Sequence, residues 1–249
     1  MDKNERQHEI IAILKKEGYT TVEKLSQLLY ASPSSIRRDL IQLEKAHLVT
    51  RSYGGVELYK TNSKTVPFSA SVQRRVPENK IIAEKAASLV RDGDIVFLDH
   101  SSCCLFLAQE LAKEKSITVM TNSIEILSIV GTDSRITLYA CGGKVSQSLR
   151  CFNDIDAAAQ FRKLHADIAF FSADALTSNG VIYDSSIDNV YVRESMMRNA
   201  VRKVFLCDSE KFGKTAGYKQ CELRDIDYLI SDVDCKERFQ RFSQELIIL

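Results

Sequence analysis

The segment from Ser32 to Glu44, SPSSIRRDLIQLE, constrains the fold of this chain more than any other stretch. Ser32 is a favourable N-cap, and Pro33 suits the first helical position, where a missing N–H costs nothing. Apolar residues then recur at the spacing of one helix face: Ile36, Leu40 and Leu43. The segment therefore predicts an amphipathic helix, with basic and hydroxyl side chains away from its apolar stripe.

The flanking residues predict a small domain around this helix. Another helix, from Val22 to Leu29, ends about three residues before the Ser32 cap, and a first helix is expected from about Asn4 to Glu17. Two helices joined by so short a turn are typical of a helix-turn-helix, whose second helix enters the DNA major groove. A helical hairpin that packs elsewhere, with its arginines in solvent, stays open as an alternative.

Two β-prone runs follow, Leu48 to Arg51 and Val56 to Tyr59, around a Tyr-Gly-Gly turn. They predict a hairpin, the wing of a winged helix, and complete a DNA-binding domain over residues 1–60. We expect arginines to contact base edges or phosphates and hydroxyls to contact phosphates, whereas Asp39 would orient an arginine because phosphates repel a carboxylate. The candidate DNA-binding residues are Ser34, Ser35, Arg37, Arg38, Arg51, Tyr53 and Gly54.

The pattern changes after residue 60. Residues 61–77 hold two of the three prolines and little periodicity, which predicts a linker. From residue 78 to 249, apolar runs alternate with helical spacing, which predicts an α/β domain with a mainly parallel sheet and a last helix from about Lys236 to Leu246. The expected strands are Ile95–Asp99, Ile117–Thr121, Ile136–Cys141, Ile168–Ser172, Lys203–Asp208 and Tyr228–Ser231.

Composition and charge exclude several classes of protein. No apolar run approaches the roughly 20 residues that span a bilayer, and the charged N-terminus is unlike a secretory signal, so we expect a cytoplasmic protein. Seven cysteines without a CxxC pair argue against a structural zinc site and a disulfide framework, and no metal or cofactor is expected. A net charge of +1 excludes a strongly basic coat protein but not a specific DNA binder.

Polar residues follow five of the expected strands, and ligands of such sheets bind outside the carboxyl ends of the strands. Hydroxyls at helix starts, a Gly-Gly turn and lysines suit a phosphate, and carboxylates or an amide suit sugar hydroxyls. Together they predict a pocket for a phosphorylated polyol. The alternative is that these residue types only cap helices and end strands, as in any protein. The residues concerned include Asp99, Ser101, Ser102, Thr121, Asn122, Gly142, Gly143, Ser172, Asp174, Asp208 and Lys211.

Taken in chain order, these motifs resemble the DeoR family of bacterial transcriptional regulators. The residues SSIRRDL, followed by LE and then RSYGG, are similar to its TIRRDL…LE…R…GG signature. The resemblance covers nearly the whole chain. It continues through Lys80–Ala87, Asp92–Asp94, Phe97–Asp99, Val119–Ser123, Gly142-Gly143, Asp167–Asp174 and Asp208–Gly213.

The resemblance implies a winged helix-turn-helix domain joined to an effector-binding and oligomerisation domain similar to the ribose-5-phosphate isomerase/CoA-transferase-like fold. In the family this domain senses a phosphorylated sugar intermediate and relieves repression. The family commonly has Gly-Thr-Thr where this chain has Ser101-Ser102-Cys103. The effector-binding residues that the resemblance implies are Asp99, Ser101, Ser102, Thr121, Asn122, Gly142, Gly143, Asp174 and Lys211.

The sequence therefore predicts a repressor of a carbohydrate-metabolism operon, a homo-oligomer (dimer or tetramer) that binds double-stranded operator DNA and a phosphorylated sugar. Two alternatives stay open. One is a sugar-phosphate isomerase with a DNA-binding appendage, in which Asp174 and Lys211 would move protons, although no second acid stands beside Asp174. The other is a constitutive DNA-binding or scaffold protein with a vestigial pocket. We expect no enzyme activity.

Overall fold

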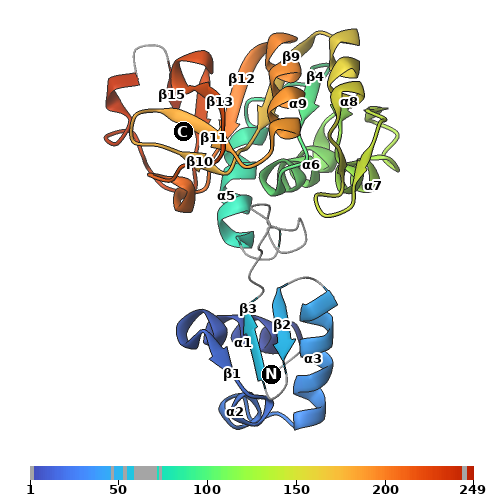
Figure 1. Ribbon diagram of the computed structural model, residues 1–249. Coiled ribbons are helices and arrows are strands. Elements are labelled where there is room, and N and C mark those ends of the chain that lie inside the picture. The colour runs from blue at the N-terminus through green and yellow to red at the C-terminus, as the bar shows by residue number, and fades with distance from the viewer. Residues whose placement is uncertain (1–2, 46–47, 53–54, 59–71, 73–74, 243–245) are drawn as a thin grey trace. The chain divides into compact units, whose positions relative to one another are not determined.

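The computed structural model describes residues 3–45, 48–52, 55–58, 72, 75–242 and 246–249. The chain divides into two compact units, Met1–Arg74 and Arg75–Leu249 (Figure 1). None of the described helices combines the length and the apolar composition needed to cross a membrane. Tyr53 and Gly54, two predicted DNA contacts, lie outside the described residues.

The described residues of the first unit form three complete helices and a small antiparallel sheet. Its hairpin, the predicted wing, is confirmed, and the pairing of β3 with the two-residue strand β1 adds a third strand in the order β1-β3-β2. Two residues carry too little alternation to predict β1. The elements are α1 (Lys3–Glu17), β1 (Tyr19–Thr20), α2 (Val22–Leu28), α3 (Pro33–Lys45), β2 (Val49–Ser52) and β3 (Gly55–Leu58).

The apolar stripe of α3 forms the centre of this unit's core. The side chains of Ile36, Leu40 and Leu43 are buried, as their spacing predicts, against apolar residues of α1, α2 and the sheet. Gly55 has a packing role, because a Cβ there would lie 2.2 Å from the Tyr19 hydroxyl oxygen. Glycine at that position therefore allows β1 to pair with β3.

The second unit contains a seven-stranded sheet whose strand pairs are all parallel. Its strand order is β15-β14-β12-β9-β4-β5-β6, which confirms the predicted α/β architecture. The strands are β4 (Ile95–Leu98), β5 (Thr118–Thr121), β6 (Thr137–Ala140), β9 (Ala166–Phe171), β12 (Ala200–Leu206), β14 (Tyr228–Ile230) and β15 (Ile247–Ile248).

Helices cover both faces of this sheet. Right-handed crossovers place the helices after β4 and β5 on one face and the helix between β9 and β12 on the other, since these connections run in opposite directions. Figure 1 shows α8 and α9 side by side, and they contact each other. The helices are α5 (Val76–Ala87), α6 (Ser102–Glu114), α7 (Ile124–Val130), α8 (Ile155–Gln160) and α9 (Ile187–Arg198). Because α5 begins at Val76, it includes the last two residues of the predicted linker.

The strand order reverses between β4 and β9. From β4 the chain passes through β5 to β6, then returns to β9 on the other side of β4 and continues outward through β12. Such a reversal leaves a crevice at the carboxyl ends of the two strands, where ligands of open α/β sheets bind. Asp99 follows β4 and Ser172 follows β9, so both lie at this switch point.

Short strands at the carboxyl side of the sheet were not predicted. They form an antiparallel sheet of order β10-β11-β13 and the hairpin β7–β8. Most have two to four residues, too few for a clear period. Their bounds are β7 (Val145–Ser146), β8 (Cys151–Phe152), β10 (Ala175–Leu176), β11 (Val181–Asp184) and β13 (Tyr218–Glu222), with short 3-10 helices η1 (Phe161–Lys163), η2 (Ser209–Lys211) and η3 (Leu223–Asp225).

The predicted helix from Lys236 to Leu246 is wrong. Residues 236–239 form a turn, and the 3-10 helix η4 (Gln240–Phe242) follows. The Phe242 ring packs so closely on the backbone at Gly180 that a Cβ there would lie 2.3 Å from it. Ile247 pairs with β14, its N–H donating to the Asp227 carbonyl at 2.9 Å. Tertiary packing and strand pairing thus override the local helical spacing.

Candidate functional site

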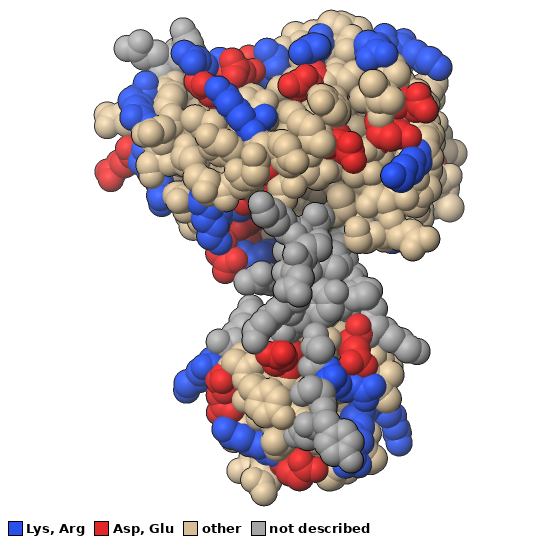
Figure 2. Space-filling model, viewed as in Figure 1, with Lys and Arg blue, Asp and Glu red and all other residues tan. Residues whose placement is uncertain are grey.

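The outer face of α3 carries the predicted DNA-reading residues. Arg37 and Arg38 are both exposed, whereas their neighbours Ile36 and Leu40 are buried. Figure 2 shows basic side chains gathered on the part of the first unit that carries α3. The helix therefore presents a guanidinium-bearing face that the unit's own core does not use.

Hydroxyl groups surround the first turn of α3. The Ser35 backbone N–H donates to Ser32 Oγ at 3.2 Å, so the predicted N-cap is confirmed. The Ser32 hydroxyl also lies 2.9 Å from the hydroxyls of both Ser34 and Ser35. A helix start with hydroxyl donors favours contact with a phosphate group.

Asp39 faces inward, away from the exposed arginines. Its carboxylate is buried and accepts from Arg6 Nε of α1 at 2.6 Å. Asp39 does pair with an arginine, as expected, and this arginine is Arg6 of α1 and not one of the exposed arginines of α3. This ion pair ties α1 to α3 and removes a negative charge from the outer face.

Arg51 of β2 is tied to α3 by Glu44. Arg51 Nε donates to one Glu44 carboxylate oxygen at 2.8 Å, and its backbone N–H donates to the other at 3.2 Å. Partial burial raises the pKa of Glu44, but these Arg51 bonds outweigh it and the net pKa is lowered. Both side chains are well exposed, so the pair leaves the guanidinium accessible to a second anion.

In the second unit, Asp99 lies completely buried at the switch point. Its carboxylate accepts from the backbone N–H of Ser101 at 2.9 Å, the backbone N–H of Ser172 at 3.1 Å and Arg193 Nε at 2.8 Å. Burial raises the pKa of Asp99, but Arg193 and the other donors lower it to about 2. Asp99 is therefore charged, and protein donors occupy both of its oxygens.

Arg193 of α9 joins this carboxylate to a second one. Its side chain is buried, and Nη1 donates to Asp184 at the end of β11. Asn189 Nδ2 also donates to the Asp184 carboxylate, at 3.0 Å. Sequence reasoning missed Arg193 and Asp184, because a helical arginine and the end of a short strand carry no local signal.

Lys211 lies beside the switch point, at the end of η2. Its ammonium donates to Ser172 Oγ at 2.8 Å and lies 3.2 Å from Asp208 Oδ2. Burial lowers the pKa of Lys211, but Cys103 and Asp208 raise it, and the net pKa is above its usual value. The structure thus brings together three strand-end residues that the sequence singled out, from β9 and β12.

The predicted residues after β5 and β6 have mixed roles. Asn122 is buried, and its Nδ2 donates to the Phe152 carbonyl at 2.8 Å, while its Oδ1 has no donor among the described residues. Thr121 Oγ1 accepts from Ser123 N–H, and the Gly142 carbonyl accepts from a glutamine. Gly143 has φ +136°, and a Cβ there would lie 2.4 Å from an Asp154 oxygen. Asn122 Oδ1 is thus a buried acceptor without a donor in the described structure.

The remaining predicted residues lie around the same edge. Ser101 caps α6, accepting from the Cys104 N–H at 3.3 Å, and Ser102 is the half-buried first residue of that helix. Asp174 is exposed and accepts from the Ser185 N–H at 2.9 Å. Ser101 therefore caps a helix, which is the role expected if these polar residues only cap helices and end strands.

The thiols and the one histidine at this edge are buried. All seven cysteines are buried and unpaired, and burial raises the pKa of the Cys103 thiol to about 11 and that of Cys141 to about 12. Burial also lowers the pKa of His100, whose Nδ1 has no partner in the described structure. Within the described residues, no group of three or more His, Cys, Asp or Glu side chains is arranged to hold a metal ion.

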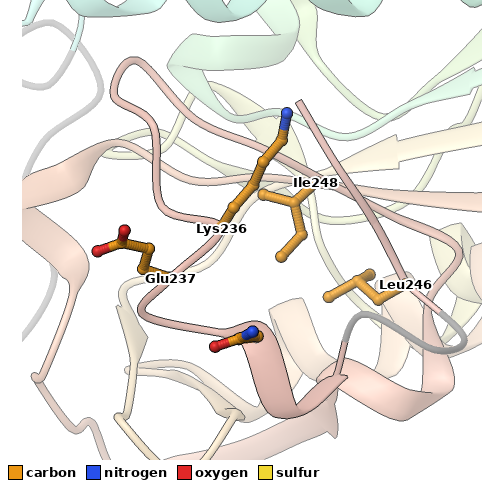
Figure 3. Close-up of a pocket in the computed structure, with 5 residues that line it drawn as sticks. Lys236, Glu237, Leu246 and Ile248 are labelled. Atoms are coloured by element: carbon orange, nitrogen blue, oxygen red, sulfur yellow. The ribbon is translucent and has the colours of Figure 1, made fainter.

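A pocket of about 500 Å³ lies in another part of the second unit, at β15 (Figure 3). Figure 3 shows an apolar side formed by Leu246 and Ile248 and polar side chains around it. Its lining contains none of the predicted site residues. It consists of Lys236, Glu237, Gln240, Leu246 and Ile248.

Curated relatives match this chain over nearly its full length. The lactose phosphotransferase system repressor of Staphylococcus aureus is 28% identical over 243 residues, covering 96% of each chain. The HTH-type transcriptional repressor GlcR of Bacillus subtilis is 31% identical, covering 93% of this chain and 89% of its own. The regulator GolR of Listeria innocua is also 31% identical, covering 92% and 90%.

Among solved structures, ribose 5-phosphate isomerase A from Methanocaldococcus jannaschii has a TM-score of 0.40 at 20% identity, covering 54% of this chain and 53% of that chain. Residues 6–62 match the DeoR-like helix-turn-helix domain, and residues 74–233 match the DeoR C terminal sensor domain. The two matches follow each other along the chain and include α3 with its exposed arginines and the switch point. The chain therefore belongs to the DeoR family of DNA-binding transcriptional regulators.

Proposed function

We propose that this protein represses a carbohydrate-metabolism operon and releases its operator when a phosphorylated sugar binds to the second unit. The observation that carries the DNA-binding part is the outer face of α3, where Arg37 and Arg38 are exposed beside a hydroxyl-rich helix start. The similarity to a repressor of a lactose phosphotransferase system and to GlcR supports the regulatory part.

On DNA, α3 would enter the major groove. Arg37 and Arg38 would contact base edges or phosphates, and Ser34 and Ser35 would contact phosphates. Arg51 and the residues at the wing tip would contact the flanking DNA backbone. A two-fold dimer would place two such helices on half-sites about 34 Å apart or a multiple of that distance. We propose that the protein is a homo-oligomer, either a dimer or a tetramer.

In the second unit, Lys211 would hold the phosphoryl group. Its ammonium lies at the carboxyl ends of β9 and β12, with the Ser172 hydroxyl at 2.8 Å. Asn122 Oδ1, buried and without a donor in the described structure, would accept from a sugar hydroxyl. Asp99 would shape the site through Arg193, because protein donors already occupy its oxygens.

A panel of sugar phosphates, each paired with its unphosphorylated sugar, tests this proposal. A phosphorylated ligand at 100 times its Kd stabilises the protein by about 2.7 kcal/mol, and thermal unfolding detects this shift. The same compound should release an operator selected from random duplexes, in a gel shift. Lys211→Ala should bind that operator as the wild type does and lose the response. If no phosphorylated member shifts the wild type, the site is not a sugar-phosphate sensor.

We propose no catalytic role for the site. Enolisation of a sugar phosphate requires a carboxylate base close to the reacting carbon, and Asp174 is exposed and accepts from the Ser185 N–H. The relatives from Staphylococcus aureus, Bacillus subtilis and Listeria innocua described above are transcriptional regulators. Incubation of the purified protein with the same panel, followed by chromatography, should show no conversion. Isomerised product that scales with protein concentration would contradict this.

A further inference from the structure

Arg75, the first residue of the second unit, has an unusual set of neighbours. Its guanidinium lies 2.7 Å from a Glu210 carboxylate oxygen, 3.5 Å from Glu78 and 3.6 Å from Asp208. One cation is thus shared by three carboxylates. Its Nε is buried and has no acceptor in the described part of the chain. Arg75 therefore retains an unused donor in a strongly acidic surrounding.

Asp208 connects Arg75 to Lys211. One of its carboxylate oxygens faces the Arg75 guanidinium, and the other lies 3.2 Å from the Lys211 ammonium. A planar carboxylate therefore bridges two cations, one at the start of α5 and one at the end of η2. A phosphoryl group presents oxygens at a similar spacing with more charge, and arginine binds such a group through two parallel N–H bonds.

A buried amide one turn further along α5 also lacks an acceptor. Asn79 is almost completely buried, its Oδ1 accepts from the Cys103 thiol at 3.1 Å, and its Nδ2 has no partner in the described structure. Cys103 belongs to α6, whose N-cap is Ser101, so this amide lies beside the first turn of that helix. Buried donors without acceptors are rare in proteins, so Arg75 Nε and Asn79 Nδ2 are two unused donors on neighbouring turns at the start of α5.

We propose that Arg75 is the second cation of the effector site, and that the phosphoryl group of the effector replaces Asp208 and Glu210 as its partner. This inference rests on the sugar-phosphate sensor proposed above. Effector binding would then act at the first residue of the second unit, because that unit begins at Arg75. A ligand shifts a regulator only through contacts that differ between two states, and the exchange of carboxylate for phosphate at Arg75 is such a contact.

The test compares five full-length proteins: wild type, Arg75→Gln, Lys211→Gln, Glu210→Gln and Arg162→Gln. The last removes an exposed arginine of η1 and serves as the matched control. The probes are inorganic phosphate and the panel member that stabilises the wild type most. Titration calorimetry gives the Kd of each probe, and anisotropy of labelled operator gives the concentration that half-releases the DNA.

Arg75→Gln should weaken binding of both probes about tenfold or more, as for loss of a charge-assisted hydrogen bond, and should raise the half-release concentration equally. Glu210→Gln should tighten binding by about two- to fivefold, because it removes a partly exposed competitor for the guanidinium. A merely structural Arg75 predicts no such gain. Arg162→Gln should match the wild type.

The outcomes separate this inference from the proposed function. If neither probe binds the wild type, the proposed sensor fails, and this inference with it. If the wild type responds and Lys211→Gln does not, but Arg75→Gln binds as the wild type does, the sensor stands and Arg75 is no ligand. Should Arg75→Gln fail to fold, Glu210→Gln decides alone, and unchanged affinity there overturns the inference.

Discussion

Arg193→Met is the substitution that tests the organisation of the switch point most directly. Arg193 is buried and is ion-paired with Asp99 and Asp184, and both of these carboxylates are buried as well. Methionine keeps most of the side-chain volume but removes the positive charge. Two buried carboxylates would then lack a counter-charge, and breaking a buried pair in this way costs about 3–5 kcal/mol.

Urea unfolding followed by far-UV circular dichroism at pH 7 measures this loss. With an m-value of about 2 kcal/mol/M, the transition of the second unit should move to lower urea by about 1.5–2.5 M. Arg198→Met is the matched control on the same helix. Arg198 is exposed and lies 3.3 Å from Glu194, and loss of such a surface pair changes stability by less than about 0.5 kcal/mol.

The pH dependence provides an independent check on the cause. The folded-state pKa of Asp99 is about 2, below its ordinary value of 3.8, so its pairing stabilises the fold above pH 4. About 2 kcal/mol of that stability is lost as the pH falls from 4 to 2. Without Arg193 the carboxylates bind protons more readily, so wild type and variant should converge in acid. A deficit below about 1 kcal/mol at pH 7, or one that stays constant down to pH 3, would refute the reasoning.

Three further substitutions test other parts of the molecule. Arg37→Ala should lower operator affinity by about 1–3 kcal/mol and relax sequence preference without a change in melting temperature; equal affinity in gel shifts would remove Arg37 from the interface. Arg6→Ala should destabilise the first unit by about 1–3 kcal/mol in thermal unfolding, because Asp39 is left buried and unpaired; an unaltered transition would contradict this. Gly143→Ala should cost about 1–3 kcal/mol, because φ is +136° and a Cβ would collide with Asp154; an unchanged melting temperature would show that the loop relaxes freely.

The elements that the sequence predicts well are those with local signals. The helix α3 has a cap, a favourable first residue and a regular stripe, so its limits and its buried face follow from residues 32–44 alone. Apolar runs identify six strands of the main sheet, because burial on both faces leaves few polar positions. The seventh strand, β15, escapes prediction because its two residues pair with β14 only after the chain has turned at η4.

The candidate site likewise has a part that the sequence predicts and a part that it does not. The topology of parallel sheets predicts that polar residues gather at the carboxyl ends of the strands. Ser172, Asp208 and Lys211 do meet there. The ion-pair partners of the site residues cannot be predicted in the same way. Arg193 and Asp99 are 94 residues apart in the sequence. Arg75, the first residue of the unit, pairs with Asp208 near its other end. No local pattern encodes such a contact, so charge compensation at the switch point is visible only in three dimensions.

That compensation has a consequence for signalling. Arg75 and Lys211 each lie within ion-pair distance of a carboxylate, so under the proposed function a phosphorylated sugar would compete with internal anions for both of these cations. This competition would lower the affinity for the effector. It would also make the effector-bound and effector-free states differ in their ion pairs. A neutral sugar would not make this exchange of ion pairs and could shift the equilibrium only through other contacts that differ between the two states. Under the proposal, discrimination for the phosphorylated form would follow from charge balance at the site.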